Sequence, residues 1–339
     1  MNSRERVFRA VEFGGPDRPP VIYNVLPGFE LKYPRELANL HLHYPSDFAE
    51  TGFTEFEEFT KEVGVGERDA WGALWVRYTD DNKGLIVEHP LDDWAKLEGY
   101  RFPDPVQAGD WSRVPEMLAR NAGEKYVLAD GETLFQRMFY LRGFENLMMD
   151  ILDESPELFY LRDRIVEFML RKIEKWLEYP VDCFRFRDDW GTQNQLFINP
   201  AKWRKIFKPA YKRLFDAVHG AGKHVFFHSD GNIFTIIPDL IELGANVLNP
   251  QPAAIGVDAL GAAFAGKICF MGDINRQTVL PFGTPAEVEA YVLKEASTLG
   301  TARGGYIGNG ELGADVPPAN AEALHRAFFS YRYGAEAAR

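Results

Sequence analysis

Polar side chains gather at four places where a short apolar run of the sequence ends in a turn. In the clearest of these, His228 and Asp230 follow two phenylalanines and precede Gly231. Residues i and i+2 of a strand point to the same side, so both side chains can face one functional site. The alternative is a hydrogen-bonded histidine and a turn-forming aspartate at the end of a strand.

Adjacent carboxylates, Asp188 and Asp189, follow a second apolar run. They could bind a metal, orient a ligand hydroxyl or act as a base. The structural alternative is an aspartate at the start of a helix together with an Arg–Asp ion pair. The third turn, at 304–313, is rich in glycine, which lets the backbone approach a ligand closely, and Glu311 is its only carboxylate. The fourth contains Asp273 and is also compatible with a simple turn.

The elements that must position these turns alternate along the chain. Short apolar runs, expected to be strands, lie at 21–25, 126–129, 183–186, 225–227, 247–248, 268–271 and 306–307. Amphipathic stretches, expected to be helices, lie at 156–178, 200–218, 235–243, 285–299 and 318–331. This alternation predicts an α/β fold with a parallel sheet buried on both faces. A chain of 339 residues suits a (β/α)8 TIM barrel, typically about 250 residues plus insertions, with the four turns at its catalytic end.

One region breaks this alternation. Residues 55–100 are rich in Trp, Asp and Gly, and the segments 73–78 and 85–89 have the pattern of a hairpin around a turn at 80–84. We interpret the region as an insertion early in the barrel that covers the site. No linker, internal repeat or low-complexity tract is present, so a single barrel domain over residues 1–339 is favoured.

Composition excludes several classes of protein. The formal net charge is −12 and no basic block occurs, which argues against a nucleic-acid partner. No run approaches the roughly 18 apolar residues of a membrane span, and the charged N-terminus does not resemble a signal peptide. Cys183 and Cys269 each lie in an apolar run, as buried reduced thiols do, so we expect a cytoplasmic protein. Motifs for a phosphate loop, a zinc protease or a serine or cysteine nucleophile are absent.

Several blocks, in order along nearly the whole chain, carry a family resemblance. They are SRERVFRAVEF with PDRPPV, RDAWGALW with EHPL and YRFPDP, LRGFENLMMD, DDWGTQNQLFINPAKWRKIFKPAYKRL, FFHSDGNIFTIIPDLIELGANVLNPQP, and MGDINRQTVLPFGTPAEV with DVPPANAEAL. These blocks resemble the uroporphyrinogen-decarboxylase superfamily, which includes decarboxylases and corrinoid- and coenzyme M-dependent methyltransferases. The resemblance implies a barrel enzyme whose active site lies at the strand C-termini.

The N-terminal part of the chain favours one branch of this superfamily. Uroporphyrinogen decarboxylases carry an Arg-Gln-Ala-Gly-Arg type segment that binds substrate carboxylates, whereas the equivalent residues 23–28 contain no arginine. Their late Gly-His-Gly corresponds to Gly308-Asn309-Gly310 here. An acidic protein without those arginines would bind a carboxylate-rich tetrapyrrole poorly. The methyltransferase-like branch is therefore favoured.

The methyltransferase branch has a zinc site made by His-x-Cys after one strand and a cysteine after the last. On this sequence the resemblance places the ligands at His228, Asp230 and Glu311, so that carboxylates replace both thiolates. Such a site implies Zn²⁺ as a cofactor that acts as a Lewis acid on a substrate oxygen instead of on a thiol. The methyl acceptor would be a corrinoid on a partner protein, since the chain has no cobalamin-binding motif.

The resemblance therefore implies a methyltransferase that moves a methyl group from a small O- or N-methylated compound to a corrinoid protein. Its catalytic residues would be Asp188, Asp189 and His228, and its substrate-binding residues Tyr23, Asn24, Trp190, Gln193 and Asn309. Two alternatives stay open. One is a decarboxylase of a small or tetrapyrrole carboxylic acid, with Asp188 or Asp189 as proton donor or cation stabiliser; the other is a non-catalytic barrel that binds a small molecule. The sequence also leaves open whether the chain forms a homodimer.

We predict that the protein does not turn over uroporphyrinogen, because residues 23–28 offer no arginine to its carboxylates. The measurement is coproporphyrinogen formation under anaerobic conditions, followed by porphyrin fluorescence after oxidation. A rate typical of enzymes, about 1 s⁻¹ or more, would overturn this prediction.

Overall fold

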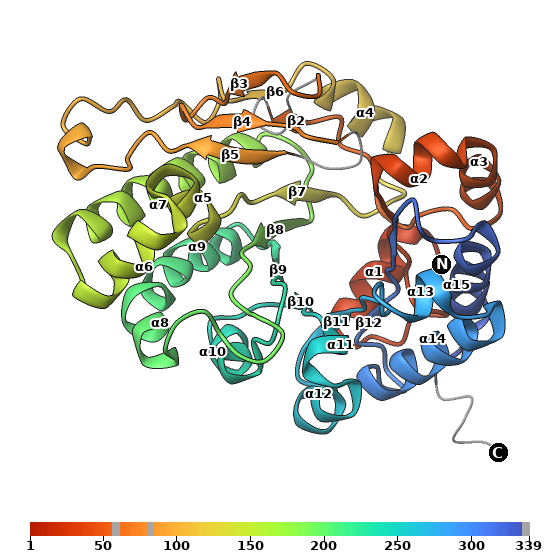
Figure 1. Cartoon of the computed structure of the whole chain (residues 1–339). Coiled ribbons are helices and arrows are strands. Elements are labelled where there is room, and N and C mark those ends of the chain that lie inside the picture. Colours follow the sequence, from red (N-terminus) through yellow and green to blue (C-terminus); the bar gives the residue numbers. More distant parts are fainter. Residues whose placement is uncertain (56–61, 80–83, 334–339) are drawn as a thin grey trace.

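A parallel sheet forms the centre of the computed structural model, which describes residues 1–55, 62–79 and 84–333. Its strands lie in the order β12-β11-β10-β9-β8-β7, and every neighbouring pair is parallel. They are β7 (Leu128–Asp130), β8 (Cys183–Arg187), β9 (His224–His228), β10 (Val247–Asn249), β11 (Cys269–Met271) and β12 (Tyr306–Ile307). Figure 1 shows these strands running through the middle of the molecule, with helices around the outside. The prediction of an α/β fold around a parallel sheet is confirmed.

Alternation along the strands separates an outer face from an inner face. On β8, Phe186 packs outward, with its ring centroid 5.3 Å from that of Phe215 on the helix behind it. Cys183 and Cys269 belong instead to a separate inner cluster of buried residues from several strands. Both thiols have no exposed surface, which confirms the burial predicted from their apolar surroundings.

Helices follow the strands and cover the outer face. They include α5 (Phe135–Arg142), α7 (Pro156–Trp176), α9 (Lys208–Gly220), α10 (Ile237–Glu242), α12 (Val257–Phe264), α14 (Pro285–Leu299) and α15 (Pro318–Ser330). Proline stands in the first turn of α7, α14 and α15, where its missing N–H removes no helical hydrogen bond. The helix predicted at 200–218 is two helices, α8 (Pro200–Ile206) and α9. They meet at Phe207 because Pro209 has no N–H for a continuous ladder.

On one edge, the segment 21–25 extends the sheet beyond β12. Val21 forms a parallel bridge with Gly308, and β1 (Asn24–Val25) pairs in parallel with β13 (Glu311–Leu312), which follows β12. The register places Asn24 opposite Glu311. Two residues far apart in the sequence, both expected in the site, are thus brought to the same strand ends.

On the other edge, a short segment that the sequence did not reveal as a strand connects 21–25 to β7. The Asp47 N–H donates to the Val21 carbonyl at 2.9 Å, and Phe48 forms a parallel bridge with Tyr126, just before β7. The two edges of the six-stranded sheet are therefore linked through the segments 21–25 and 47–49. An eight-stranded barrel requires contacts of this kind between its strands.

A buried ion cluster holds the segment 47–49 in place. The Asp47 carboxylate has no exposed surface and accepts hydrogen bonds from Arg6 at 2.7 Å, Arg18 at 2.8 Å and the Val21 N–H at 2.8 Å. The Arg6 and Arg18 side chains are themselves only 10% and 11% exposed. Because a buried charge without a partner is costly, these groups depend on one another.

The region 55–100 contains a separate antiparallel sheet. Its strands are β3 (Gly66–Arg68), β4 (Leu74–Val76) and β5 (Leu85–Glu88). The strands β4 and β5 pair with each other and lie within the segments expected to form a hairpin, while the turn expected at 80–84 falls almost wholly outside the described residues. The sheet packs on α5, with the ring centroids of Trp75 and Tyr140 5.2 Å apart, and lies above α5 and α7 in Figure 1.

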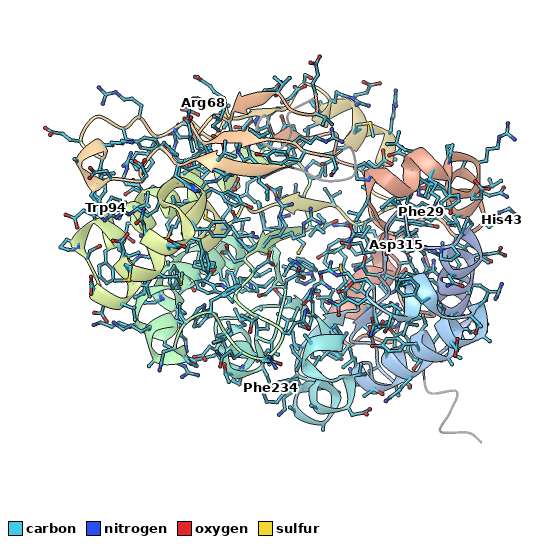
Figure 2. All side chains as sticks on the ribbon, in the orientation of Figure 1. Phe29, His43, Arg68, Trp94, Phe234 and Asp315 are labelled. Carbon is cyan, nitrogen blue, oxygen red and sulfur yellow. The ribbon has the colours of Figure 1, made fainter. Side chains whose placement is uncertain are left out.

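Side chains fill the space between the central sheet, the helices and this antiparallel sheet (Figure 2). Within residues 1–55, 62–79 and 84–333, no helix is both long and apolar enough to cross a membrane.

We predict that Asp47→Asn lowers the free energy of unfolding by about 3 kcal/mol, because the buried Arg18 loses its charged hydrogen-bond partner and Arg6 keeps its ion pair with Asp17 but loses the one with Asp47. The measurement is chemical denaturation followed by circular dichroism. The control is Asp216→Asn, whose carboxylate lies on the surface beside Lys212 and should contribute less than about 1 kcal/mol. Equal losses in the two variants would contradict the prediction.

Candidate functional site

Strand register puts Arg187, His228 and Asn249 side by side at the ends of three neighbouring strands. Arg187 on β8 is the partner of His228 on β9, and His228 is the partner of Asn249 on β10. Two positions earlier on β9 and β10, Phe226 and Val247 belong to the inner core cluster. Because side chains alternate along a strand, the inner face changes from apolar to polar toward the strand C-termini.

Three potential ligand atoms meet at the tips of β8 and β9. His228 Nε2 lies 3.5 Å from Asp189 Oδ1 and 3.6 Å from Asp230 Oδ1. The ligand atoms of these residues all lie within 4.8 Å of one another, and each residue is partly exposed. Asp230 Oδ1 itself is buried and has no hydrogen-bond partner among the residues that the structure describes. We call Asp189, His228 and Asp230 the ligand cluster.

The hydrogen bonds around Asn249 indicate which ring nitrogen of His228 carries the hydrogen. The Asn249 amide group donates to the carbonyls of Met271 at 3.0 Å and Gly272 at 3.3 Å, which turns its Oδ1 toward the ring. His228 Nδ1 lies 2.8 Å from this oxygen and therefore carries the hydrogen. In the neutral imidazole, Nε2 then carries a lone pair and no hydrogen. It therefore cannot donate a hydrogen bond to the two carboxylate oxygens that it faces. A cation, either a metal ion or a proton on Nε2, stabilises such an arrangement.

Neighbouring side chains orient the two carboxylates of the ligand cluster. Asp189 Oδ2 accepts from Gln136 Nε2 at 2.6 Å, and Asp189 Oδ1 accepts from the Asp230 N–H at 2.9 Å. Asp230 Oδ2 accepts from Arg276 Nη2 at 2.8 Å, which leaves Oδ1 toward His228. Each member of the ligand cluster is thus held by a second residue, as the ligands of metal sites usually are.

A close backbone contact makes the ligand cluster possible. A Cβ atom on Gly231 would lie 2.1 Å from the Gly191 carbonyl, and one on Gly191 would lie 2.4 Å from the Asn232 nitrogen. Gly231 also has a φ of +77°, which disfavours other residues. The tips of β8 and β9 can therefore touch only because both positions are glycine.

The strand tips carry more negative than positive charge. Asp230, Asp273 and Glu311 surround one arginine, Arg276, and Asp189 lies beside Asp230. Burial raises the pKa of Asp273 to about 6; Arg276 opposes this shift, and Glu311 and Asp230 add to it. Excess negative charge, with imidazole nitrogen and carboxylate oxygen as donors, fits a divalent cation such as Zn²⁺.

Glu311, expected from the resemblance to be the third metal ligand, is engaged differently. Its Oε2 accepts from Arg276 Nη1 at 3.1 Å and from Asn24 Nδ2 at 3.2 Å. Among the described residues, the group whose ligand atoms meet contains Asp189 where Glu311 was expected. The structure therefore brings together His228 and Asp230, as expected, but with Asp189 as the third residue. Arg276 lies between Glu311 and this ligand cluster. Asn24, expected to bind substrate, lies at the mouth of the site.

Asp188, expected to be catalytic, lies behind the ligand cluster. It is 1% exposed and accepts hydrogen bonds from the Tyr211 hydroxyl at 2.5 Å and from the N–H groups of Leu134 and Gln136 at 2.9 Å. Burial raises its pKa to about 7, against the effect of these hydrogen bonds. Asp188 thus holds the start of α5, and with it the Gln136 side chain that orients Asp189.

Three of the residues expected to bind substrate lie in different surroundings. Asn309 is at the strand tips, where its amide donates to the Gly272 carbonyl at 3.1 Å. Trp190 is fully buried, with its ring stacked 4.0 Å from Phe135, so it is not available to a substrate. Gln193 is exposed in the loop after β8.

Tyr23, also expected to bind substrate, packs among residues of other elements. Its hydroxyl donates to the Tyr44 carbonyl at 2.8 Å, and its ring stacks 4.3 Å from that of His325 on α15. His325 is buried and its Nδ1 donates to the Ala321 carbonyl at 2.7 Å. The neighbouring position, Asn24, faces the site instead, as strand alternation requires.

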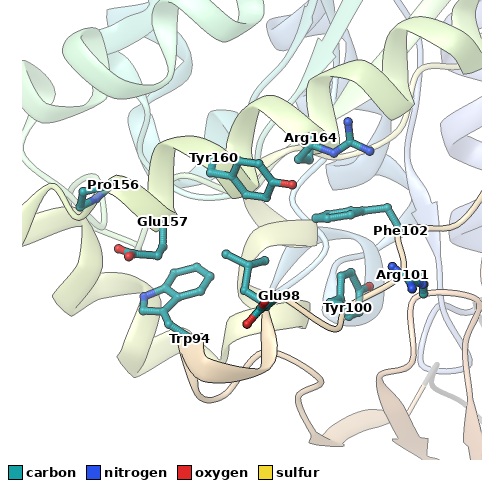
Figure 3. A pocket seen from close by; sticks show the side chains of 10 residues that line it. Trp94, Glu98, Tyr100, Arg101, Phe102, Pro156, Glu157, Tyr160 and Arg164 are labelled. Carbon is teal, nitrogen blue, oxygen red and sulfur yellow. The ribbon is translucent and has the colours of Figure 1, made fainter.

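A cavity of about 720 Å³ between α7 and the segment 94–102 shares no residue with the ligand cluster (Figure 3). Its lining mixes acidic and basic side chains with aromatic rings. The Tyr100 hydroxyl donates to the Trp71 carbonyl at 2.7 Å, and the Trp94 N–H donates to Asp150 at 3.0 Å. The first contact lies within the insertion, and the second attaches the insertion to Asp150 outside it, which gives the lining a structural role.

A parallel α/β sheet with a histidine and carboxylates at its strand C-termini defines a broad class of proteins that contains many enzymes. Within this class, the family model described as uroporphyrinogen decarboxylase (URO-D) matches residues 69–332, most of the chain. The chain belongs to the uroporphyrinogen decarboxylase (URO-D) family, as the sequence blocks indicated.

Individual relatives agree with this assignment. Uroporphyrinogen decarboxylases from two strains of Thermus thermophilus are each 24% identical over 263 residues, covering 71% of this chain and 69% of theirs. The solved structure of a methyltransferase from Methanosarcina mazei matches 97% of this chain and 98% of its own, with a TM-score of 0.73 and 15% identity. The latter likeness shows a shared fold.

We predict that His325 makes the protein sensitive to acid. Burial lowers its pKa from 6.5 to about 4, so the unfolded chain binds this proton more readily than the folded protein. The free energy of unfolding should be unaffected above pH 6.5 and fall by up to about 3 kcal/mol as the pH decreases toward 4. Denaturation of the wild type and of His325→Phe, which keeps a stacking ring but does not titrate, measures the difference. The same pH dependence in both proteins would refute it.

Proposed function

We propose that the protein is a metal-assisted methyltransferase that removes a methyl group from a small O- or N-methylated compound. The observation that carries the proposal is the ligand cluster, in which Nε2 of His228 and oxygens of Asp189 and Asp230 face one space within 4.8 Å of one another. In this proposal the three residues hold one Zn²⁺, which when bound supplies Lewis acidity at the atom that loses the methyl group.

The chain's own residues would prepare this site in three ways. Asn249 keeps the hydrogen of His228 on Nδ1, so that Nε2 can donate its electron pair to the metal ion. Gln136 and Arg276 orient the two carboxylates. Methyl transfer leaves an electron pair on the substrate oxygen or nitrogen that loses the methyl group. The permanent positive charge of the Arg276 guanidinium stabilises negative charge that develops on this atom.

Two observations favour methyl transfer over decarboxylation of a tetrapyrrole. Residues 23–28 contain no arginine, and the strand-tip arginines Arg187 and Arg276 are already paired with carboxylates. Arg187, for example, donates to Asp130 at 2.8 Å. The shared fold with a solved methyltransferase also supports this reaction class.

We further propose that the methyl acceptor is a corrinoid on a partner protein. The ligand cluster is partly exposed, so an acceptor can approach it from outside the chain. The reaction would take place at the mouth of a closed (β/α)8 barrel, and the contacts of the segments 21–25 and 47–49 support such closure. A decarboxylase acting on a small carboxylic acid is the second candidate, favoured by the Thermus relatives.

We predict that the wild type retains about one Zn²⁺ per chain after equilibrium dialysis, measured by plasma mass spectrometry. His228→Ala and Asp189→Asn should bind Zn²⁺ about 100-fold more weakly or worse, because each loses a donor. His43→Ala is the matched control, since its ring is exposed on α3 (Pro34–His43) and contacts the Asn39 carbonyl. Wild-type Zn²⁺ retention by His228→Ala would rule out the proposed metal site.

Activity is tested with cob(I)alamin as the acceptor and a panel of methoxybenzoates and methylamines as donors. At least one donor should yield methylcobalamin with the zinc-loaded wild type and none with His228→Ala. Release of CO₂ from a small carboxylic acid, without methylcobalamin formation from any donor, would favour the decarboxylase instead.

A further inference from the structure

Arg276 connects acidic side chains from two different strand tips. It lies in the loop after β11, where Nη2 donates to Asp230 Oδ2 at 2.8 Å and Nη1 donates to Glu311 Oε2 at 3.1 Å. The Arg276 side chain is 29% exposed, and those of Asp230 and Glu311 are 33% and 21% exposed. The guanidinium is therefore a fixed part of the strand tips and not a surface group in bulk water.

Asp230 stands between two positions that suit a cation. Its Oδ1 is buried, faces His228 Nε2 at 3.6 Å and has no hydrogen-bond partner within the described part of the chain. Its Oδ2 faces the Arg276 guanidinium. In two-metal sites, where the ions lie roughly 3.5–4 Å apart, a carboxylate with one oxygen toward each ion can bridge them. Here a guanidinium fills the second of the two positions.

Further acidic groups surround that second position. Glu311 is paired with Arg276 and also accepts from Asn24. Asp273, three residues before Arg276, has Arg276, Glu311 and Asp230 among its electrostatic neighbours. Without Arg276, the Asp230 and Glu311 carboxylates would both lose the cation that they share, with the Asp273 carboxyl nearby.

We infer that the guanidinium of Arg276 takes the place of a second metal ion, so that the site binds one divalent cation and not two. The inference rests on the metal site proposed above at Asp189, His228 and Asp230. Two carboxylates that face the same position are stabilised by a cation there, and an arginine supplies a charge that does not depend on pH or on metal supply. Arg276 therefore sets the metal stoichiometry of the site.

Replacing Arg276 with a neutral residue should open the second position to a metal ion. Mn²⁺ is the probe, because the vacated position offers carboxylate oxygens, which suit this ion. Equilibrium dialysis should give about one Mn²⁺ per chain for the wild type and about two for Arg276→Ala. Two ions that share Asp230 should also show an exchange-coupled electron paramagnetic resonance signal, which one ion cannot give.

Three variants control this experiment. Arg276→Lys keeps a cation and should stay at about one Mn²⁺. Arg276→Ala combined with Glu311→Gln should return to about one, because the second position loses a carboxylate. Arg276→Gln is a second neutral variant that keeps most of the side-chain volume, and thermal unfolding by circular dichroism reports whether each variant is folded.

The outcomes separate this inference from the proposed function. One Mn²⁺ per chain in the wild type and in both folded neutral variants would overturn the role of Arg276 and leave the proposed metal site intact. Two Mn²⁺ in the wild type would also overturn it. No bound Mn²⁺ or Zn²⁺ in any of these proteins would overturn the metal site itself, and the inference with it.

Discussion

One imidazole nitrogen and two carboxylates that face the same space define the candidate site. Asp189 and Asp230 place carboxylate oxygens within 4.8 Å of each other and of His228 Nε2. Two negative charges at that distance repel by about 3 kcal/mol at an effective dielectric constant near 20, so the arrangement needs compensation. Gln136, the Asp230 N–H and Arg276 supply part of it through hydrogen bonds. The remaining negative charge of the two carboxylates faces one space, and a cation bound there would compensate it.

That arrangement depends on elements spread over the whole sheet. The glycine contact between Gly191 and Gly231 brings the β8 and β9 tips together, and buried Asp188 fixes the start of α5 behind them. Asn249 is fixed in turn by backbone carbonyls at the end of β11. Distant parts of the chain therefore determine the direction of each donor atom, although the three donors lie within 42 positions of one another in the sequence.

Part of the fold was predictable because it depends on local patterns. Apolar runs that alternate with amphipathic stretches predicted the strands of the central sheet and most of its covering helices. The segment 47–49 escaped prediction because it is short and contains the charged Asp47, whose burial depends on Arg6 and Arg18 from elsewhere. The break at Phe207 was also missed, although Pro209 could have indicated it. Asn249 and Arg276 each follow a predicted strand, but nothing local distinguishes them from ordinary turn residues.

The sequence by itself determined the family, the parallel α/β fold and the polar strand tips at Asp189, His228 and Asp230, because ordered blocks and strand alternation are local properties of the chain. Only the tertiary structure decided which of the acidic side chains meet. It placed Arg276 between Glu311 and Asp230, and buried Asp188 and Trp190. The physical reason is that distances between side chains on different strands follow from sheet register and backbone contact, which residue types and spacing do not specify.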